Sequence, residues 1–110
     1  HKETWWNKDG RKELEKNYLN DLLDGKDTLW FDSGQISTET NYKKGKKHGT
    51  YSQWFENGQI QNRGSNIMGK ANGKWIIYHE NGFKFIESNY INGIQSGEGI
   101  WWDDAGNLIE

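Results

Sequence analysis

Histidines are the residues of this 110-residue chain best suited to metal or acid–base chemistry, and there are three: His1, His48 and His79. They lie far apart, and no pair has the H-x-x-x-H or H-E-x-x-H spacing of a zinc site on a helix. The chain contains no cysteine, which excludes disulfides and thiolate metal sites. We therefore predict no metal site and no cofactor, and we interpret the histidines as solvated surface residues.

Acidic residues recur just before a glycine, at Asp32, Glu56, Glu80 and the pair Asp103-Asp104. Two carboxylates about 5–10 Å apart could hydrolyse a glycosidic bond if a cleft held the sugar between them. These acids instead flank segments typical of turns, where polar residues are the default. The nucleophile elbow G-x-S-x-G and the glycine-rich phosphate loops are also absent. We predict no catalytic residues and no enzyme activity.

One basic cluster stands out, formed by Lys43, Lys44, Lys46 and Lys47. Clustered lysines attract anionic lipid headgroups, so contact with a membrane surface is one hypothesis for this segment. A solvated polar loop is the alternative, and it is favoured because the equivalent segments further along the chain are not basic. The whole chain has a net charge of −2. Since nucleic-acid binders usually carry a basic field, we predict no nucleic-acid partner.

Glycines show which elements must position these residues. Three ladders share a period of 24 residues, namely Gly10, Gly34, Gly58, Gly82 and Gly106, then Gly25, Gly49, Gly73 and Gly97, then Gly45, Gly69 and Gly93. A fixed period of this length indicates a repeat architecture. We divide the chain into a degenerate first repeat or cap (1–25), three repeats (26–49, 50–73 and 74–97) and a partial last repeat (98–110).

Each repeat is interpreted as a β-hairpin. Asn57-Gly58 is the strongest short hairpin signal, because a type I′ turn needs positive φ at both central residues. A two-residue turn there places Phe55 opposite Ile60. The same rule pairs Phe31 with Ile36, Tyr78 with Phe85, Ile77 with Ile86, and Trp102 with Ile109.

Aromatic residues make up 15% of the chain and carry most of its apolar burial. Trp30, Trp54, Tyr78 and Trp102 form one row, which we expect stacking of the hairpins to bury. The opposite row runs Phe31, Phe55, His79 and Asp103, and so changes from apolar to polar. We predict a partner-docking patch of Phe31, Ile36, Phe55 and Ile60. The alternative is that these residues contact a neighbouring copy or pack against the connector tyrosines.

The segment 12–24 allows a second interpretation. Leu14, Tyr18 and Leu22 lie at i, i+4 and i+8, as on one face of a helix, and Gly25 could follow its C-terminus. A degenerate repeat is favoured, because several glycine and aromatic positions keep the period there.

The segments 49–60 and 73–82 resemble the variant MORN repeat. The pattern aromatic-x-x-Asn-Gly, followed by Tyr-x-x-Gly-x-x-x-Gly, is similar to that of bacterial YwqK-like proteins. The resemblance implies consecutive antiparallel hairpins in an elongated, twisted sheet, with no shared catalytic residues. Proteins of the YwqK type are often labelled antitoxins, and other MORN proteins are described as membrane-associated or as scaffolds.

We therefore expect an all-β fold of tandem antiparallel hairpins in a single-layer sheet. The expected function is non-catalytic protein binding, and the resemblance adds a specific version, an antitoxin or immunity partner of a bacterial toxin. The alternatives are membrane-surface association through residues 43–47 and self-association through the end repeats, whose strand edges are open. The chain starts at His1 and has no apolar run of 18 residues, which leaves both a cytoplasmic and an exported location open.

Overall fold

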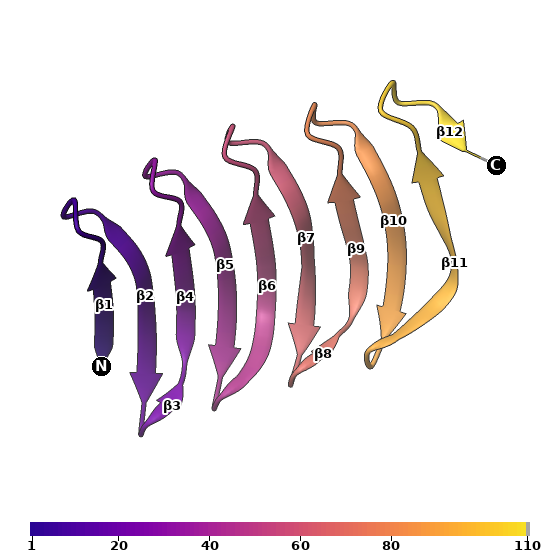
Figure 1. Ribbon diagram of the computed structural model, residues 1–110. Coiled ribbons are helices and arrows are strands. Elements are labelled where there is room, and N and C mark those ends of the chain that lie inside the picture. The colour runs from indigo at the N-terminus through magenta and orange to yellow at the C-terminus, as the bar shows by residue number, and fades with distance from the viewer. Residues whose placement is uncertain (110) are drawn as a thin grey trace.

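The computed structural model describes residues 1–109, which form one open antiparallel β-sheet (Figure 1). The strands are β1 (Lys2–Trp6), β2 (Lys12–Leu19), β3 (Leu22–Leu23), β4 (Gly25–Trp30), β5 (Ile36–Lys43), β6 (Lys46–Trp54), β7 (Ile60–Ile67), β8 (Lys70–Ala71), β9 (Gly73–Tyr78), β10 (Lys84–Ile91), β11 (Ile94–Trp102) and β12 (Leu108–Ile109). The strand order is β1-β2-β4-β5-β6-β7-β9-β10-β11-β12, with β3 paired to β2 and β8 paired to β7. The expected all-β fold of consecutive hairpins is confirmed.

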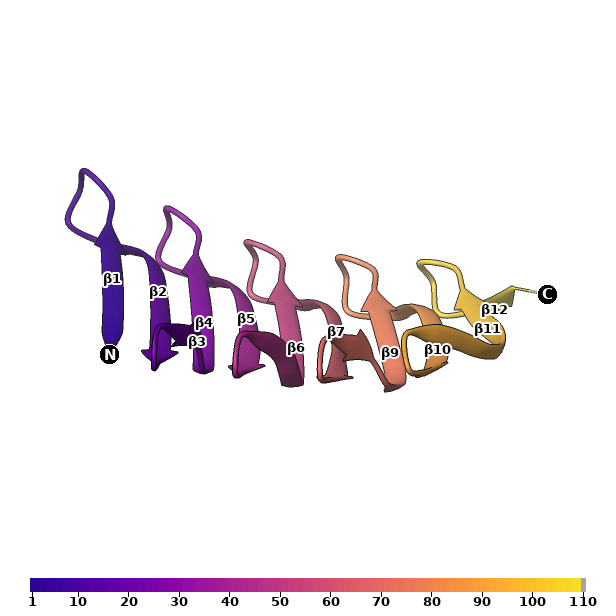
Figure 2. The same ribbon diagram turned by 90° about the horizontal axis from the view of Figure 1, so that it is seen from below.

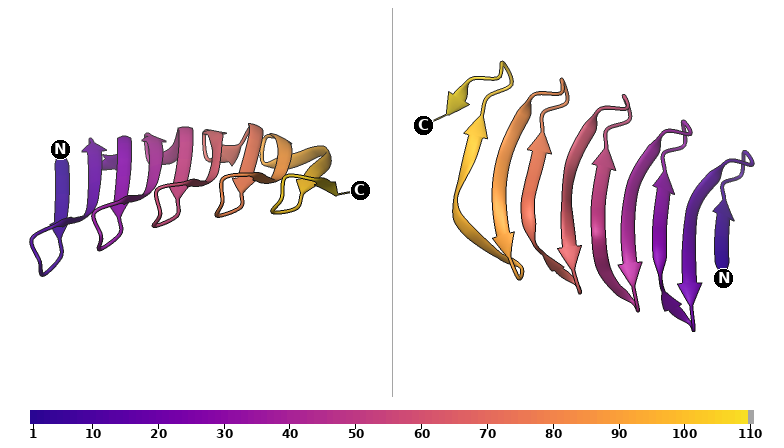
Figure 3. Two further views of the ribbon diagram at one scale, coloured as in Figure 1. Left: turned by 90° about the horizontal axis from the view of Figure 1, so that it is seen from above. Right: turned by 180° about the vertical axis from the view of Figure 1, so that it is seen from behind.

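The sheet is a thin single layer measuring 47 × 33 × 12 Å. Hairpin tips line one side of it, and the short turns that join successive hairpins line the other (Figures 1 and 2). Both views in Figure 3 show the same progression of hairpins from the N-terminus to the C-terminus. Within residues 1–109, Ile76 is the only apolar residue that is buried, and even it remains 7% exposed. Cross-strand rows, rather than a thick core, therefore hold the sheet together.

The hairpin tips are three-residue loops, so the predicted type I′ turn at Asn57-Gly58 is wrong. The Gly58 N–H donates to the Phe55 carbonyl (3.0 Å), and the Phe55 N–H donates to the Gln59 carbonyl (2.9 Å). Gly58 has a φ of 89°, whereas Asn57 does not have a positive φ. This is the type I turn with a bulged left-handed glycine that closes many three-residue hairpins. The tips after Asn7, Phe31, His79 and Asp103 repeat both bonds.

The longer loop changes the register next to each tip. Trp54 pairs with Ile60, and Trp30 pairs with Ile36, so the predicted Phe55–Ile60 and Phe31–Ile36 pairs are wrong. Tyr78 pairs with Lys84, and Trp102 pairs with Leu108, which corrects the Tyr78–Phe85 and Trp102–Ile109 pairs.

A β-bulge one step further along the strands cancels this shift. Gln53 pairs with Asn62 beyond the bulge, which leaves Gln61 as the extra residue of the longer strand. The same compensation lets Ile77 pair with Ile86, as predicted. The central parts of these hairpins therefore keep the register that the sequence indicates.

Type I′ turns lie at the opposite side of the sheet. Lys44 and Gly45 have φ values of 50° and 83° in the two-residue turn between β5 and β6. The turn between β2 and β3 uses Asn20 and Asp21, at 51° and 67°. Asn and Asp tolerate the left-handed conformation better than other non-glycine residues, which explains how the first repeat keeps its turn without a glycine.

Residues 12–24 form β2, β3 and the start of the connection to β4, so the helical alternative is wrong. Leu14 pairs with Trp5 on one side and with Leu29 on the other. Neighbouring strands on both sides supply the backbone hydrogen bonds that a helix would have made internally. The segment therefore forms strands, and its assignment as a degenerate repeat stays a prediction.

Candidate binding surfaces

The two-residue turns at 44–45, 68–69 and 92–93 are each fastened to the hairpin before them by two backbone donors. The Gly45 N–H donates to the Leu23 carbonyl (2.8 Å), and the Lys44 N–H donates to the Asp24 carboxylate (3.2 Å). The next turn repeats both bonds, from Gly69 to the Lys47 carbonyl and from Met68 to Nδ1 of His48. The turns therefore stack in register along one edge of the sheet.

We call this edge the turn edge and define it by the turn-flanking residues and two turn residues: Leu19, Leu22, Lys43, Lys44, Lys46, Ile67, Met68, Lys70, Ile91 and Ile94. All of them are exposed. The apolar members are unusually open to solvent, with Leu19 59%, Ile91 60% and Ile94 73% exposed. Exposed apolar side chains that gather on one surface mark interaction sites.

The predicted basic cluster falls in the middle of the turn edge. Lys43, Lys44, Lys46 and Lys47 are all exposed, and none forms an ion pair with another residue of the range 1–109. Their charges are thus free to face a partner. Leucines precede them along the edge and isoleucines follow them, so the surface is both basic and apolar.

The predicted docking patch lies at the other side of the sheet, close to the hairpin tips. Phe31, Ile36, Phe55 and Ile60 are all half-buried rather than exposed. Successive tips pack on each other, since a Cβ at Gly58 would lie 3.5 Å from the Gln35 side chain. The four residues are therefore brought to neighbouring tips, and their role in docking stays a prediction.

One face of the sheet carries an unbroken row of directly paired residues. In strand order the row is Trp5, Leu14, Leu29, Thr38, Gln53, Asn62, Ile77, Ile86, Trp101 and Ile109. Directly paired residues point to the same face, and we call this face the row face. Its row is apolar at both ends and polar in the middle.

A shallow apolar groove of about 310 Å³ hollows the row face near the C-terminal end of the row. Trp75, Ile77, Ile86 and Tyr90 line most of it. The Trp75 indole N–H donates to the Ser65 carbonyl (3.1 Å), and its ring stacks on Tyr51 at 5.6 Å. These two contacts hold the Trp75 ring over β7 toward β6, and the ring also makes an edge contact with Tyr90 of β10 at 6.4 Å.

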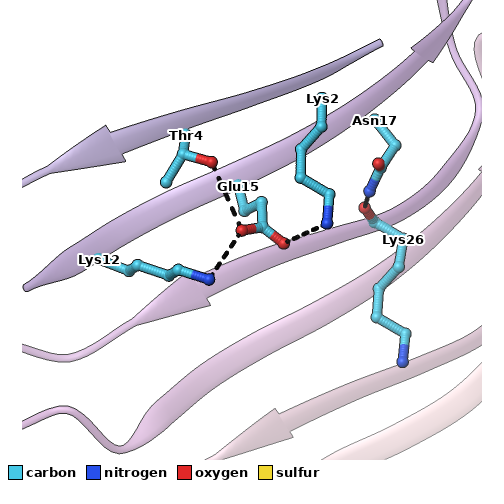
Figure 4. A network of polar contacts seen from close by, with 6 residues as sticks. All are labelled: Lys2, Thr4, Lys12, Glu15, Asn17 and Lys26. Carbon is cyan, nitrogen blue, oxygen red and sulfur yellow. Dashed lines mark hydrogen bonds and ion pairs between the residues drawn. The ribbon is translucent and has the colours of Figure 1, made fainter.

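The opposite face carries ion pairs, and we call it the charged face. Figure 4 shows Glu15 between two lysines, with Lys12 at 3.1 Å and Lys2 at 3.5 Å. The Lys12 hydrogen bond, with weaker help from Lys2, lowers the pKa of Glu15 despite its partial burial. Glu39 pairs with Lys26, and Glu87 pairs with two further lysines in the same manner.

Two histidines hold successive repeats together, so the interpretation of both as solvated surface residues is wrong. His48 is half-buried and accepts the Met68 N–H at Nδ1 (3.2 Å). His79 is half-buried against Phe85, with its Nε2 2.9 Å from the Trp102 carbonyl. Each ring therefore fastens the repeat that follows it. The sequence feature that indicates this role of His48 is its position directly before Gly49. Asp24 and Asn72 hold the same position in their own repeats, and the side chain of each accepts a backbone hydrogen bond from the next turn.

The acidic residues before the tip glycines do not converge. Asp32, Glu56, Glu80 and Asp104 are exposed at separate tips, whereas Asp103 is half-buried and caps its own tip. Backbone N–H groups, that of Asn107 first, lower the pKa of Asp103. Among residues 1–109 no group of three or more histidine, aspartate or glutamate side chains could hold a metal ion.

Known families support the repeat architecture. A family model described as MORN repeat variant matches residues 47–65 and residues 71–92. The chain carries two detected MORN repeats. The first covers most of β6 and β7, and the second covers β9 and β10. No curated protein matches the chain. MORN repeats are binding modules for proteins and membranes, and the family is not an enzyme family. Within residues 1–109 the structure has no helix long and apolar enough to cross a membrane.

The apolar residues of the turn edge are candidate site residues that the sequence-based predictions do not include. Outside the lysine cluster, a leucine or isoleucine directly precedes each two-residue turn, as Ile91 precedes Asn92-Gly93. That pattern was available in the sequence. It was overlooked because the left-handed turn was assigned to the opposite end of each hairpin.

Proposed function

We propose that this protein is a non-catalytic binding module that holds a protein partner through the turn edge. The supporting observation is the stack of turns that exposes Leu19, Ile67, Ile91 and Ile94 beside unpaired lysines. Apolar anchors supply most of the binding energy of an interface, and charges at its rim select and steer the partner. A partner with apolar pockets and an acidic rim fits this surface.

A finer version assigns the partner. By its resemblance to YwqK-like proteins, the chain would be the antitoxin or immunity partner of a bacterial toxin. That role needs a surface that covers the toxin and no chemistry of its own. The turn edge offers such a surface, and its exposed apolar residues support this version of the proposal.

The test is quantitative affinity capture with purified chain, followed by titration of the captured protein after it has been purified. One stoichiometric partner is expected, and the double variant Ile67→Glu/Ile91→Glu should weaken its binding about thirtyfold or more, as loss of a hot spot does. Phe55→Glu is the matched variant at the hairpin tips. If Phe55→Glu abolished binding and the double variant did not, the partner would use the predicted tip patch instead. Co-expression of the partner with and without this chain would then test the antitoxin role through growth.

The same edge favours a second function, association with an anionic membrane surface. Apolar residues that can enter the interface lie beside lysines that attract anionic headgroups, and this combination typifies peripheral membrane binding. Lys43, Lys44, Lys46 and Lys47 would supply the electrostatic part. Ile67, Met68, Ile91 and Ile94 would supply the apolar part.

Vesicle sedimentation separates the two functions. Membrane association predicts binding to vesicles of phosphatidylcholine with phosphatidylserine but not to phosphatidylcholine alone. This binding should fall as salt is raised, because screening shortens the reach of the lysine charges. Replacement of the four lysines by glutamine should remove it. Absence of binding to either vesicle would contradict the membrane function and leave the protein partner.

A further inference from the structure

The row face is self-complementary. From β1 to β11 its row contains three apolar residues, three polar residues and three apolar residues, and Gln53 on β6 lies at the centre. Reversing the order of the strands therefore leaves the pattern of polarity unchanged. A surface with this property matches a second copy of itself related by a two-fold axis.

The two-fold axis of this arrangement lies above β6 and runs parallel to the strands. Rotation of one copy about this axis reverses the order of its strands, whereas the position of each row along the strand direction stays the same. Trp5 then meets Trp101 of a second copy, Leu14 meets Ile86, and Leu29 meets Ile77. Apolar residues meet apolar residues at both ends of the interface, and Gln53 meets Gln53 at its centre.

A second row on the row face, two residues from the first along each strand, also fits this arrangement. It contains the charged residues Glu3, Lys16 and Asp27 at its N-terminal end. In the second copy they meet Gly99, Ser88 and Trp75, which are uncharged. Within these two rows no like charges face each other, so electrostatic repulsion does not oppose the pairing there. Nearer the turn edge, Lys47 pairs with Tyr42 on the row face and meets Lys47 of the second copy across the axis, which is the one like-charge contact of the arrangement among the residues named.

The size of the face also suits a dimer. The sheet outline of 47 × 33 Å is nearly twice the area of about 800 Å² that each partner buries in a standard interface. The row face is not covered by any other element of residues 1–109, and Trp5, Leu29 and Trp101 remain 41%, 43% and 46% exposed. Ile77 and Ile86 of the groove face Leu29 and Leu14 of the second copy, and Trp75 and Ser88 of the groove face Asp27 and Lys16.

We propose that two copies of this chain pack row face to row face, with reversed strand order, into a two-layer β-sandwich dimer. The second layer buries the apolar ends of the row and fills the groove, as facing sheets do in a sandwich. The turn edge lies outside this interface. Dimerisation and partner binding at the turn edge are thus separate properties, and either can fail without the other.

Sedimentation equilibrium over about 1–100 µM chain, a range that covers interfaces of moderate affinity, tests the dimer. The expected mass is twice the chain mass of 12.9 kDa at the upper end. A single mass of one chain at every concentration would overturn the proposal.

Two neighbouring residues with nearly equal exposure provide matched variants. Trp101 lies on the row face, and Ile100 points to the charged face with 44% exposure. Trp101→Glu should raise the dimer dissociation constant about thirtyfold or more, because it places a charge at both ends of the interface. Ile100→Glu should leave it unchanged. Equal changes of the dimer dissociation constant in the two variants would contradict the assignment of the interface to the row face. Cooperative melting curves of both variants serve as the control that each one folds.

Cross-linking tests the position of the axis and does not depend on folding of the Trp101 variant. The chain has no cysteine, so Gln53→Cys introduces a single reactive site. A short bismaleimide should link two Gln53→Cys copies in high yield, because that residue meets itself across the axis. Ser52→Cys, on the opposite face, should not be linked. A reversed result, or equal yields, would overturn the two-fold arrangement even if the chain is dimeric.

Discussion

His48 shows how a single side chain can join two repeats. Its Nδ1 accepts the Met68 N–H, and Asn72 does the same for the Asn92 N–H one repeat later, through its side-chain oxygen. Both residues precede a connector glycine. The position therefore requires a hydrogen-bond acceptor of suitable length rather than a histidine as such.

His48→Asn should consequently leave stability nearly unchanged, because asparagine already fills this role at position 72. His48→Leu should lower the free energy of unfolding by about 1 kcal/mol, the usual net value of one hydrogen bond. Urea denaturation of both variants measures the difference. Equal losses in the two variants would mean that the ring packs rather than accepts.

Asp27 is an acid that the fold disfavours. Burial raises its pKa above the ordinary 3.8, with Lys16 partly opposing the shift, and its Oδ1 is buried without a hydrogen-bond partner. A raised pKa in the folded state means that the stabilising contribution is complete below pH 3.8 and is lost as pH rises through the folded pKa. Asp27→Asn should therefore raise the melting temperature at pH 7 and have no such effect near pH 3. A lower melting temperature at pH 7 would show that the carboxylate has a stabilising partner.

Glu15 provides the opposite case on the charged face. Its pKa is lowered from the ordinary 4.5 by Lys12 and Lys2, so its contribution is present above pH 4.5 and is lost as pH falls through the folded pKa. Glu15→Gln should destabilise the fold at pH 7 by less than about 1 kcal/mol, since both lysines are largely exposed. Thermal melts across pH 2–7 should show this loss disappearing at the acid end. A loss that persisted there would point to packing instead of charge.

At the scale of the elements, a glycine without positive φ supports the wall of the groove. A Cβ placed on Gly64 would overlap the Trp75 ring, whereas Gly64 itself does not have a positive φ. The requirement for glycine at this position is therefore steric. It arises because Trp75 lies across β7 to stack on Tyr51.

Gly64→Ala should therefore destabilise the fold by about 1–3 kcal/mol, as overpacking does, and displace the Trp75 indole. Urea denaturation gives the first value, and the chemical shift of the indole N–H reports the second. The double variant Gly64→Ala/Trp75→Leu should recover part of the lost stability. No recovery would mean that the alanine clashes with the backbone rather than with the ring.

The tip glycines are required for a different reason. Gly34 has a φ of 95°, and a Cβ there would meet nothing within 4 Å. Gly34→Ala should therefore cost only the conformational penalty of about 1–2 kcal/mol. Gly34→Asn should cost less, since asparagine tolerates positive φ. Denaturation curves for both variants test this order, and a reversed order would contradict the conformational explanation.

The hairpins could be predicted from the sequence, but the types of their turns could not. Period, glycine phase and aromatic spacing together predicted the strands of the central repeats and the pairing of Ile77 with Ile86. Asn57-Gly58 was assigned to a type I′ turn because the dipeptide favours it. In the structure a type I′ turn lies instead at Lys44-Gly45. Both the type I′ turn and the three-residue loop at 56–58 contain a glycine with positive φ, so the Asn-Gly dipeptide alone does not distinguish the two turn types.

At the scale of the whole molecule, the even length of the repeat keeps its faces constant. Side chains alternate between faces, so positions 24 residues apart point to the same side as long as bulges recur in step. The row face and the charged face persist from β1 to β11 for this reason. The period can be read from the sequence, but the bulges next to the hairpin tips have no sequence signal that shows which residues share a face.

Removal of one full repeat tests this argument. Deletion of residues 50–73 joins Gly49 to Lys74 in phase, and the product should fold with the same sheet and lower stability, as expected for a repeat array. Deletion of residues 51–73 removes one residue fewer and should disturb the register, which exchanges the faces beyond the junction. Circular dichroism and urea denaturation compare the two chains. Equal stability would contradict the dependence on phase.

The bonds that fasten each turn all run from a later residue back to an earlier hairpin, as from Gly45 to Leu23, Gly69 to Lys47 and Gly93 to Ala71. Strands likewise pair only within their own hairpin or with the connector and hairpin next to it along the chain. A nascent chain therefore never has to wait for a distant segment to be synthesised. Each hairpin can lock onto the one before it as it leaves the ribosome, and the sheet grows in the order of translation.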